Sequence, residues 1–193
     1  VLFPPENVKM YPDKATVSFD FGTLDKVMEG EFRPGHFSGV ALVVSKLFNI
    51  VQPDRAYFGQ KDWQQFAVIR KLIEELNFNI TLRSVDTLRE SDGLALSSRN
   101  LRLSAPQRAK ATVFYKGLVE ARKSLRNGDD LAKVRSKVRE IVEAQPDVRL
   151  EYFELADSKN LNLLNYVEQS SKPIMCIAGF VGDIRLIDNM FLD

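Results

Sequence analysis

The feature that most constrains the fold is a strand, a glycine and an amphipathic helix that follow one another in the first half of the chain. The apolar run 56–58 stops at Gly59, and apolar side chains then recur every three or four residues from Trp63 to Leu76. Another strand-like run follows at 80–85. A strand, a crossover helix and a second strand predict neighbouring parallel strands with helices packed on them.

The segments before this unit give further expected elements. Apolar residues at helical spacing predict a helix over 37–51 with one buried face. The alternating residues 16–21 predict a short strand, and 24–29 a short helix that ends at Gly30. Residues 1–3 indicate the end of a strand, so we expect a further segment of the protein upstream of them.

The chain changes character after residue 85. Residues 86–100 are polar and contain the turn signal Asp92-Gly93. We therefore divide the chain into an α/β domain over 1–87 and a small α+β domain over 88–193. The second domain is expected to hold two helices and three strands, over 104–126, 131–144, 148–155, 172–180 and 184–190.

Composition excludes several classes of protein. With 45% hydrophobic and 27% charged residues, the 193-residue chain is typical of a soluble globular protein, and no apolar run approaches the roughly 20 residues of a membrane helix. A formal net charge of +1 gives no reason to expect a nucleic-acid partner. The single cysteine, Cys176, stands in an apolar run and predicts a buried thiol. A reducing, cytoplasmic setting fits that cysteine content.

The end of the first strand of the central unit carries the clearest chemistry. Ligands of α/β proteins bind at the carboxyl ends of parallel strands, and helix N-termini attract anions. Gly59 lets a ligand approach the backbone, and Lys61 adds a mobile positive charge. Asp62 can cap the following helix or accept hydrogen bonds from sugar hydroxyls. The alternative is an ordinary surface loop.

Other polar residues fit the same chemistry. The hydroxyls and guanidinium of Ser97–Arg99 suit phosphate oxygens, although a polar linker would have the same composition. Arg33 and His36 flank a turn before a helix, where the histidine either packs or donates to an anion. Either Gln64 or Gln65 can face the strand ends and bind a small polar substrate, or remain in solvent. We expect the three clusters around Arg33, Lys61 and Ser97 to meet at one nucleotide site.

A series of motifs then resembles the pantoate–β-alanine ligase (pantothenate synthetase) family along essentially the whole chain. The motifs, in order, lie at 33–37, 43–49, 52–54, 58–62, 92–100, 179–180 and 182–189. The resemblance implies a Rossmann-like nucleotidyltransferase domain with a parallel sheet, here incomplete, and a smaller domain that closes over the site. It implies that the pantoate carboxylate attacks the α-phosphorus of ATP, in the presence of Mg²⁺, to give pantoyl adenylate and pyrophosphate. β-Alanine then attacks the acyl adenylate, which gives pantothenate and AMP. This reaction would belong to the coenzyme A pathway. A cytoplasmic homodimer is also implied.

The resemblance implies roles for individual residues, none of them as a metal ligand. Lys61 would bind phosphates and stabilise charge during adenylation, and Gly59 and Asp62 would hold the ribose. Leu88 and Leu96 would lie near the adenine. The mobile phosphate-binding signature of the superfamily would be Ser97, Ser98 and Arg99. Gln65 would bind pantoate. The β-alanine and phosphate end of the site would hold Arg33 and His36. The catalytic set would be Lys61, Ser97, Arg99 and His36.

The departures from the family pattern leave alternatives open. The family's His-x-Gly-His signature, its first pantoate-binding glutamine and the acidic residue linked to Mg²⁺ have no match here, and Gln60 replaces a glutamate. One hypothesis is therefore a part of the enzyme that is inactive alone. The other is a non-catalytic nucleotide- or phosphate-binding module. An RNA-binding relative is disfavoured, because the net charge is +1.

Overall fold

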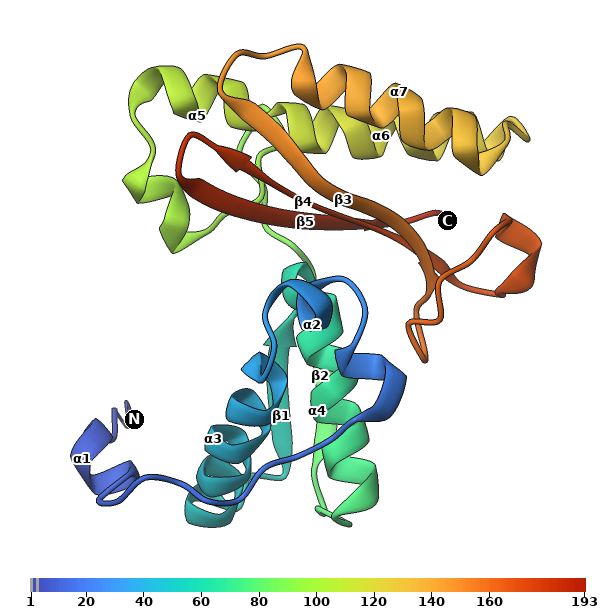
Figure 1. Ribbon diagram of the computed structural model, residues 1–193. Coiled ribbons are helices and arrows are strands. Elements are labelled where there is room, and N and C mark those ends of the chain that lie inside the picture. The colour runs from blue at the N-terminus through green and yellow to red at the C-terminus, as the bar shows by residue number, and fades with distance from the viewer. Residues whose placement is uncertain (1, 3) are drawn as a thin grey trace.

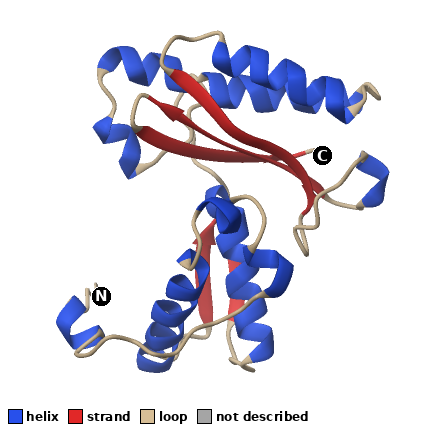
Figure 2. Cartoon of the chain, viewed as in Figure 1, coloured by secondary structure: helices blue, strands red, loops and turns tan. Residues whose placement is uncertain are grey.

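The computed structural model describes residue 2 and residues 4–193, and within them the elements form two parts (Figure 1). In the first part, helices pack against a two-stranded parallel sheet. In the second part, helices lie along one side of a three-stranded antiparallel sheet (Figure 2). The described elements of the first part include α1 (Asn7–Met10), α2 (Glu29–Phe32), α3 (His36–Val51), β1 (Arg55–Gly59), α4 (Trp63–Glu75) and β2 (Thr81–Val85). Those of the second part include α5 (Ala105–Ala111), α6 (Val113–Arg126), α7 (Leu131–Glu143), β3 (Val148–Asp157), β4 (Pro173–Val181) and β5 (Ile184–Phe191).

The parallel unit expected from the sequence is confirmed. Strands β1 and β2 pair in parallel, with Arg55 opposite Thr81 and Gly59 opposite Val85, and α4 is the crossover helix between them. The apolar face of α4 is buried through Phe66, Ile69 and Leu72. Because the strands are parallel and in register, both carboxyl ends lie at one edge of the sheet, where α4 begins.

The second part has a sheet with two buried faces. β4 is its central strand and pairs antiparallel with β3 and β5. One face packs against α5, α6 and α7 through residues such as Met175 and Ile177. The other face contributes Tyr152, Ile174 and Cys176 to the core of the first part. The two parts therefore share apolar surface, and Cys176 is a buried thiol as expected.

Two expected elements of the first part are wrong. Residues 16–21 form no strand and pair with no described strand; the rings of Phe19 and Phe21 instead stack on each other and pack on the core. Residues 24–29 are not one helix: a 3₁₀ turn, Gly22–Asp25, is followed by α2. Gly30 lies inside α2, where a Cβ would come within 2.0 Å of the Asp25 carbonyl oxygen. The glycine is thus required by close packing.

Smaller differences occur elsewhere. The single helix expected over 104–126 is interrupted at Thr112, whose hydroxyl donates to the Ala109 carbonyl at 2.9 Å. The capping box at its start is present, with Ser104 and Gln107 bonded reciprocally. The strand expected at 1–3 falls on residues 1 and 3, which lie outside the described residues. Within the described chain, no helix has the length and apolar character needed to cross a membrane.

Candidate active site

Lys61 lies in a short 3₁₀ turn, η2 (Gln60–Asp62), between the carboxyl end of β1 and the first residue of α4. A Cβ added at Gly59 would meet no atom within 4 Å, so the end of the strand borders open space. Asp62 occupies the N-cap position of α4, but its side chain makes no capping hydrogen bond. Its carboxylate is therefore available for another partner, which favours the second of the two roles expected for it.

Arg33 and His36 are joined across the turn that starts α3. An Arg33 Nη1 lies 3.0 Å from His36 Nε2. Since a guanidinium only donates, Nε2 is the acceptor and the proton of the neutral ring is on Nδ1. Partial burial, together with repulsion from Arg33, lowers the pKa of His36. The imidazole is thus neutral near pH 7, and Nδ1–H is its remaining donor.

The third cluster caps a short helix of its own. Ser97 precedes the 3₁₀ helix η3 (Ser98–Arg102), and its hydroxyl accepts from the Arg99 amide at 3.2 Å. Ser98 is exposed. Within the described residues, the Arg99 guanidinium is in no ion pair. Its charge is therefore not neutralised by the described part of the protein.

Two adjoining hollows bring the three clusters together around Lys61. The polar lining of the first includes Glu29, Arg33, His36, Lys61, Asp62 and Gln65. The second is lined in part by Lys61, Ser97 and Asn100. Lys61, Ile187 and Asp188 border both. The charges of Asp62 and Arg99 also act on the pKa of His36, consistent with their being close to it.

The two glutamines that begin α4 have different surroundings. Gln64 is buried and structural: its Oε1 accepts from the Glu29 amide at 3.0 Å and its Nε2 donates to the carbonyls of Leu24 and Val27 at 2.9 Å. Both glutamines border the first hollow, but Gln65 is partly exposed and its side chain has no hydrogen bond among the described residues. Of the two, Gln65 is therefore the one available to a ligand.

Leu88 and Leu96 are placed side by side on a loop. The Leu96 amide donates to the Leu88 carbonyl at 2.9 Å. Leu88 is 70% exposed and Leu96 is 49% exposed. Two exposed apolar side chains on one loop are compatible with contact to a planar apolar group. Neither borders the two hollows around Lys61.

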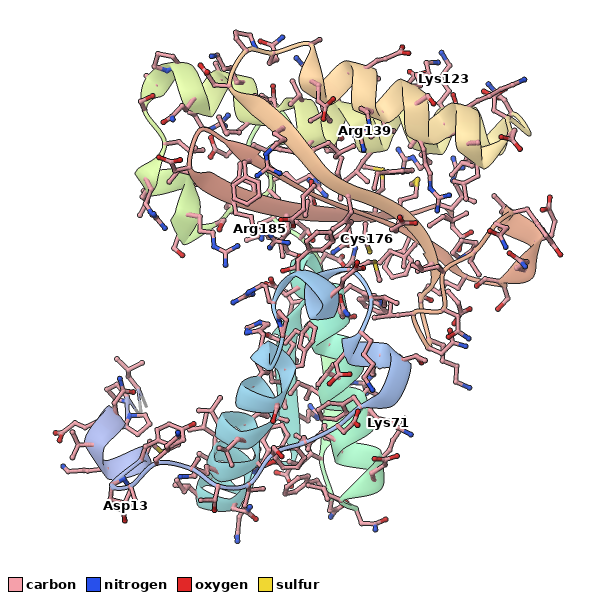
Figure 3. All side chains as sticks on the ribbon, in the orientation of Figure 1. Asp13, Lys71, Lys123, Arg139, Cys176 and Arg185 are labelled. Carbon is pink, nitrogen blue, oxygen red and sulfur yellow. The ribbon has the colours of Figure 1, made fainter. Side chains whose placement is uncertain are left out.

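Sequence reasoning missed an ion network that joins the two parts behind this site. The Glu29 carboxylate accepts from Arg185 at 2.6 and 2.8 Å and from the Tyr152 hydroxyl at 3.0 Å. Arg185 also donates to Glu151 at 2.8 Å, and Glu29 lies 3.7 Å from Arg33. Figure 3 shows Arg185 and Cys176 where the second part faces the first.

The network changes the ionisation of its members. Burial alone would raise the pKa of Glu29, but hydrogen bonds and attraction from Arg185 outweigh it and the pKa is lowered. Burial and the Glu29 charge raise the pKa of Tyr152 well above its ordinary value, and burial raises that of Cys176 to about 12. Arg185 stands 156 residues from Glu29, so no local sequence pattern could have paired them.

The chain is similar to known proteins over nearly its whole length. The model of the pantoate-beta-alanine ligase family matches residues 1–191. The chain belongs to this family. It is 45% identical over 188 residues to the pantothenate synthetase of Bacteroides thetaiotaomicron, and 44% identical over 191 residues to that of Aquifex aeolicus. These alignments cover 97% and 98% of this chain but 66% and 67% of the relatives. The chain thus spans about two thirds of the length of these pantothenate synthetases.

Solved structures of the same family have the same fold. The pantothenate synthetase of Thermus thermophilus aligns with a TM-score of 0.90 at 39% identity, over 97% of this chain and 68% of that one. A pantoate-beta-alanine ligase from Francisella tularensis aligns with a TM-score of 0.74 at 29% identity, over 96% of this chain and 62% of that one. That ligase was solved in complex with beta-gamma ATP and beta-alanine. The predicted fold class and the family resemblance are therefore confirmed.

Proposed function

We propose that this chain acts in the ATP-dependent ligation of pantoate to β-alanine. The pantoate carboxylate attacks the α-phosphorus of ATP, and pyrophosphate leaves; the β-alanine amine then attacks the acyl carbon of pantoyl adenylate, and AMP leaves. The observation that carries the proposal is the convergence of the Arg33, Lys61 and Ser97 clusters on adjoining hollows in a member of this family. Adenylyl transfer needs positioning and cations around the phosphates, and no side-chain nucleophile.

In this proposal, each cluster binds a different part of the reactants. Lys61 follows the phosphates as charge develops, and Ser97, Ser98 and Arg99 donate to the phosphate oxygens from the same side. Gly59 and Asp62 hold the ribose, and Leu88 and Leu96 lie against the adenine. Pantoate is bound by Gln65. The β-alanine and phosphate end of the site is formed by Arg33 and His36. The neutral His36 donates through Nδ1–H and is held by Arg33.

We propose that the chain acts as two domains, 1–87 and 88–193, with the second closing over the reactants. The acyl adenylate would be hydrolysed in open solvent, so exclusion of water by a closing domain protects it. In the closed arrangement, the apolar surface shared by the two parts and the Glu29–Arg185 ion pair would hold the second domain against the first.

A magnesium ion fits this chain only as a companion of the nucleotide. In the described part of the chain, no group of three or more His, Cys, Asp or Glu residues could hold a metal. Of the two carboxylates beside Lys61, Asp188 is bound by Arg89 at 2.6 and 2.9 Å. Mg²⁺ commonly binds through substrate phosphates and water with few protein ligands. We also propose that the protein is a cytoplasmic homodimer, as the family resemblance implies. Sedimentation equilibrium tests the dimer.

The test is Lys61→Ala in the intact enzyme, that is, with this chain extended to the full length of its relatives. A charge-stabilising donor at a transition state contributes about 3 kcal/mol, so we expect single-turnover pyrophosphate formation to slow about a hundredfold with the fold retained. Lys71→Ala, on the far end of α4 and paired with Glu75, is the matched control. An unchanged rate in the Lys61 variant would contradict the proposal. ATP binding with no pyrophosphate formation even by the intact enzyme would favour the alternative, a non-catalytic nucleotide-binding module.

A further inference from the structure

The main chain that carries Lys61 is held by a single side chain of the second part. Asn189, on β5, donates from Nδ2 to the Gln60 carbonyl at 2.9 Å and to the Lys61 carbonyl at 2.8 Å. The turn itself, η2, has only three residues, so it forms few hydrogen bonds of its own. Two successive carbonyls are thus fixed by one carboxamide that lies 128 residues away in sequence.

The surroundings of Asn189 make this contact specific. The residue is 3% exposed, so bulk water has little access to the two carbonyls in its place. Its Oδ1 is buried and has no hydrogen-bond partner among the described residues. The two donor contacts therefore determine the orientation of the amide, since only the nitrogen can face two carbonyl oxygens.

Asn189 is itself held rigidly. On β5 it lies opposite Cys176, which belongs to β4, the central strand of the second sheet. The carboxylate of the preceding residue, Asp188, accepts hydrogen bonds from Nη1 and Nη2 of Arg89, and Arg89 Nη2 also donates to the Asn189 carbonyl at 3.2 Å. The main-chain amide of Asn189 donates to the Asp188 carboxylate at 2.8 Å. The Asn189 carboxamide therefore projects from a strand, β5, that is paired with β4. The ion pair between Arg89 and Asp188 also holds this strand in place.

We propose that Asn189 is a positioning residue for Lys61: its carboxamide fixes the turn so that the Lys61 ammonium stands at the phosphates during adenylation. The inference rests on the proposed function of Lys61. A donor misplaced by about 1 Å can lower a rate a hundredfold, so loss of this support acts on the chemical step. It also makes the position of Lys61 depend on the second part of the chain.

The test uses Asn189→Ala and Asn189→Asp in the intact enzyme. Alanine removes both donors, and aspartate has nearly the same shape but sets carboxylate oxygens against two carbonyl oxygens. We expect the single-turnover rate of pyrophosphate formation to fall between about tenfold and a hundredfold in the alanine variant and further in the aspartate variant, with little change in the KM for ATP. Val142→Ala is the control, because it opens the core of the second part far from Lys61.

A second measurement does not depend on the activity. We expect hydrogen exchange in the peptide 58–66 to quicken in both Asn189 variants and to stay unchanged in Val142→Ala. Unchanged exchange in that peptide, or an aspartate variant as fast as the unmodified protein, would overturn the positioning role. So would a loss of rate that Val142→Ala reproduces. If the intact enzyme without substitutions forms no pyrophosphate, the proposed function fails, while the exchange data still decide whether Asn189 holds the turn.

Discussion

The buried carboxylate of Glu29 offers the sharpest test of how the two parts are held together. Glu29 is 7% exposed and accepts two hydrogen bonds from Arg185 and one from Tyr152. Removing one partner of a buried ion pair costs about 3–5 kcal/mol. Arg185 keeps Glu151 as a second partner, so we expect Glu29→Gln to lower the free energy of unfolding by about 3 kcal/mol, the lower end of that range.

The loss of unfolding free energy in Glu29→Gln should depend on pH. Although burial opposes it, Arg185 lowers the pKa of Glu29 below its ordinary value of 4.5. A carboxylate with a lowered folded pKa stabilises the fold fully above its unfolded pKa, and this stabilisation disappears as the pH falls through the folded pKa. The difference in unfolding free energy between the unmodified protein and Glu29→Gln should therefore be largest near neutral pH and shrink below about pH 4.5.

Tryptophan fluorescence during urea unfolding measures this difference. Trp63 is the single tryptophan, and its indole donates to the Ser158 carbonyl at 3.0 Å, so its signal reports on the contact between the two parts. Glu154→Gln is the matched control: it breaks a partly exposed pair with Arg135 and should cost at most about 1 kcal/mol. A loss for Glu29→Gln no larger than the control, or one that is the same at neutral and acid pH, would refute the reasoning.

Three further outcomes are expected. As the single histidine, His36 is assigned directly by NMR and should titrate below 6.5; Arg33→Leu should raise its midpoint, and an unshifted midpoint would contradict the contact. The loop 97–99 should be protected from hydrogen exchange when ATP binds, because the Arg99 charge gains a partner; equal protection with and without ATP counts against its role. Gly30→Ala should cost about 1–3 kcal/mol in thermal unfolding, because its Cβ would meet the backbone at 2.0 Å. Gly59→Ala, whose Cβ meets nothing within 4 Å, should leave stability nearly unchanged, and equal losses in the two variants would refute the packing argument.

Local patterns predicted the elements whose hydrogen bonds and burial are set by neighbouring residues. The helical spacing of Phe37, Val44 and Phe48 predicted α3, and the Ser104–Gln107 capping box predicted the start of α5. The same reasoning was wrong for 16–21, because alternation indicates one buried face but does not supply a partner strand. It was also wrong for Gly30, because the packing of α2 against Asp25 is a contact in space that no local pattern encodes.

The sequence by itself determined the parallel unit, the position of Lys61 at its carboxyl edge, and the family. These follow from apolar periodicity and short motifs, which are properties of adjacent residues. Only the tertiary structure decided that the Gln64 amide is engaged in buried hydrogen bonds while Gln65 is available to a ligand. It also decided that Glu29 meets Arg185 and that Asn189 contacts the turn of Lys61. The physical reason is that a buried polar group must find a hydrogen-bond partner, and the partner is whichever group the packed sheet brings within reach. For Glu29 and Lys61 that partner lies more than a hundred residues away.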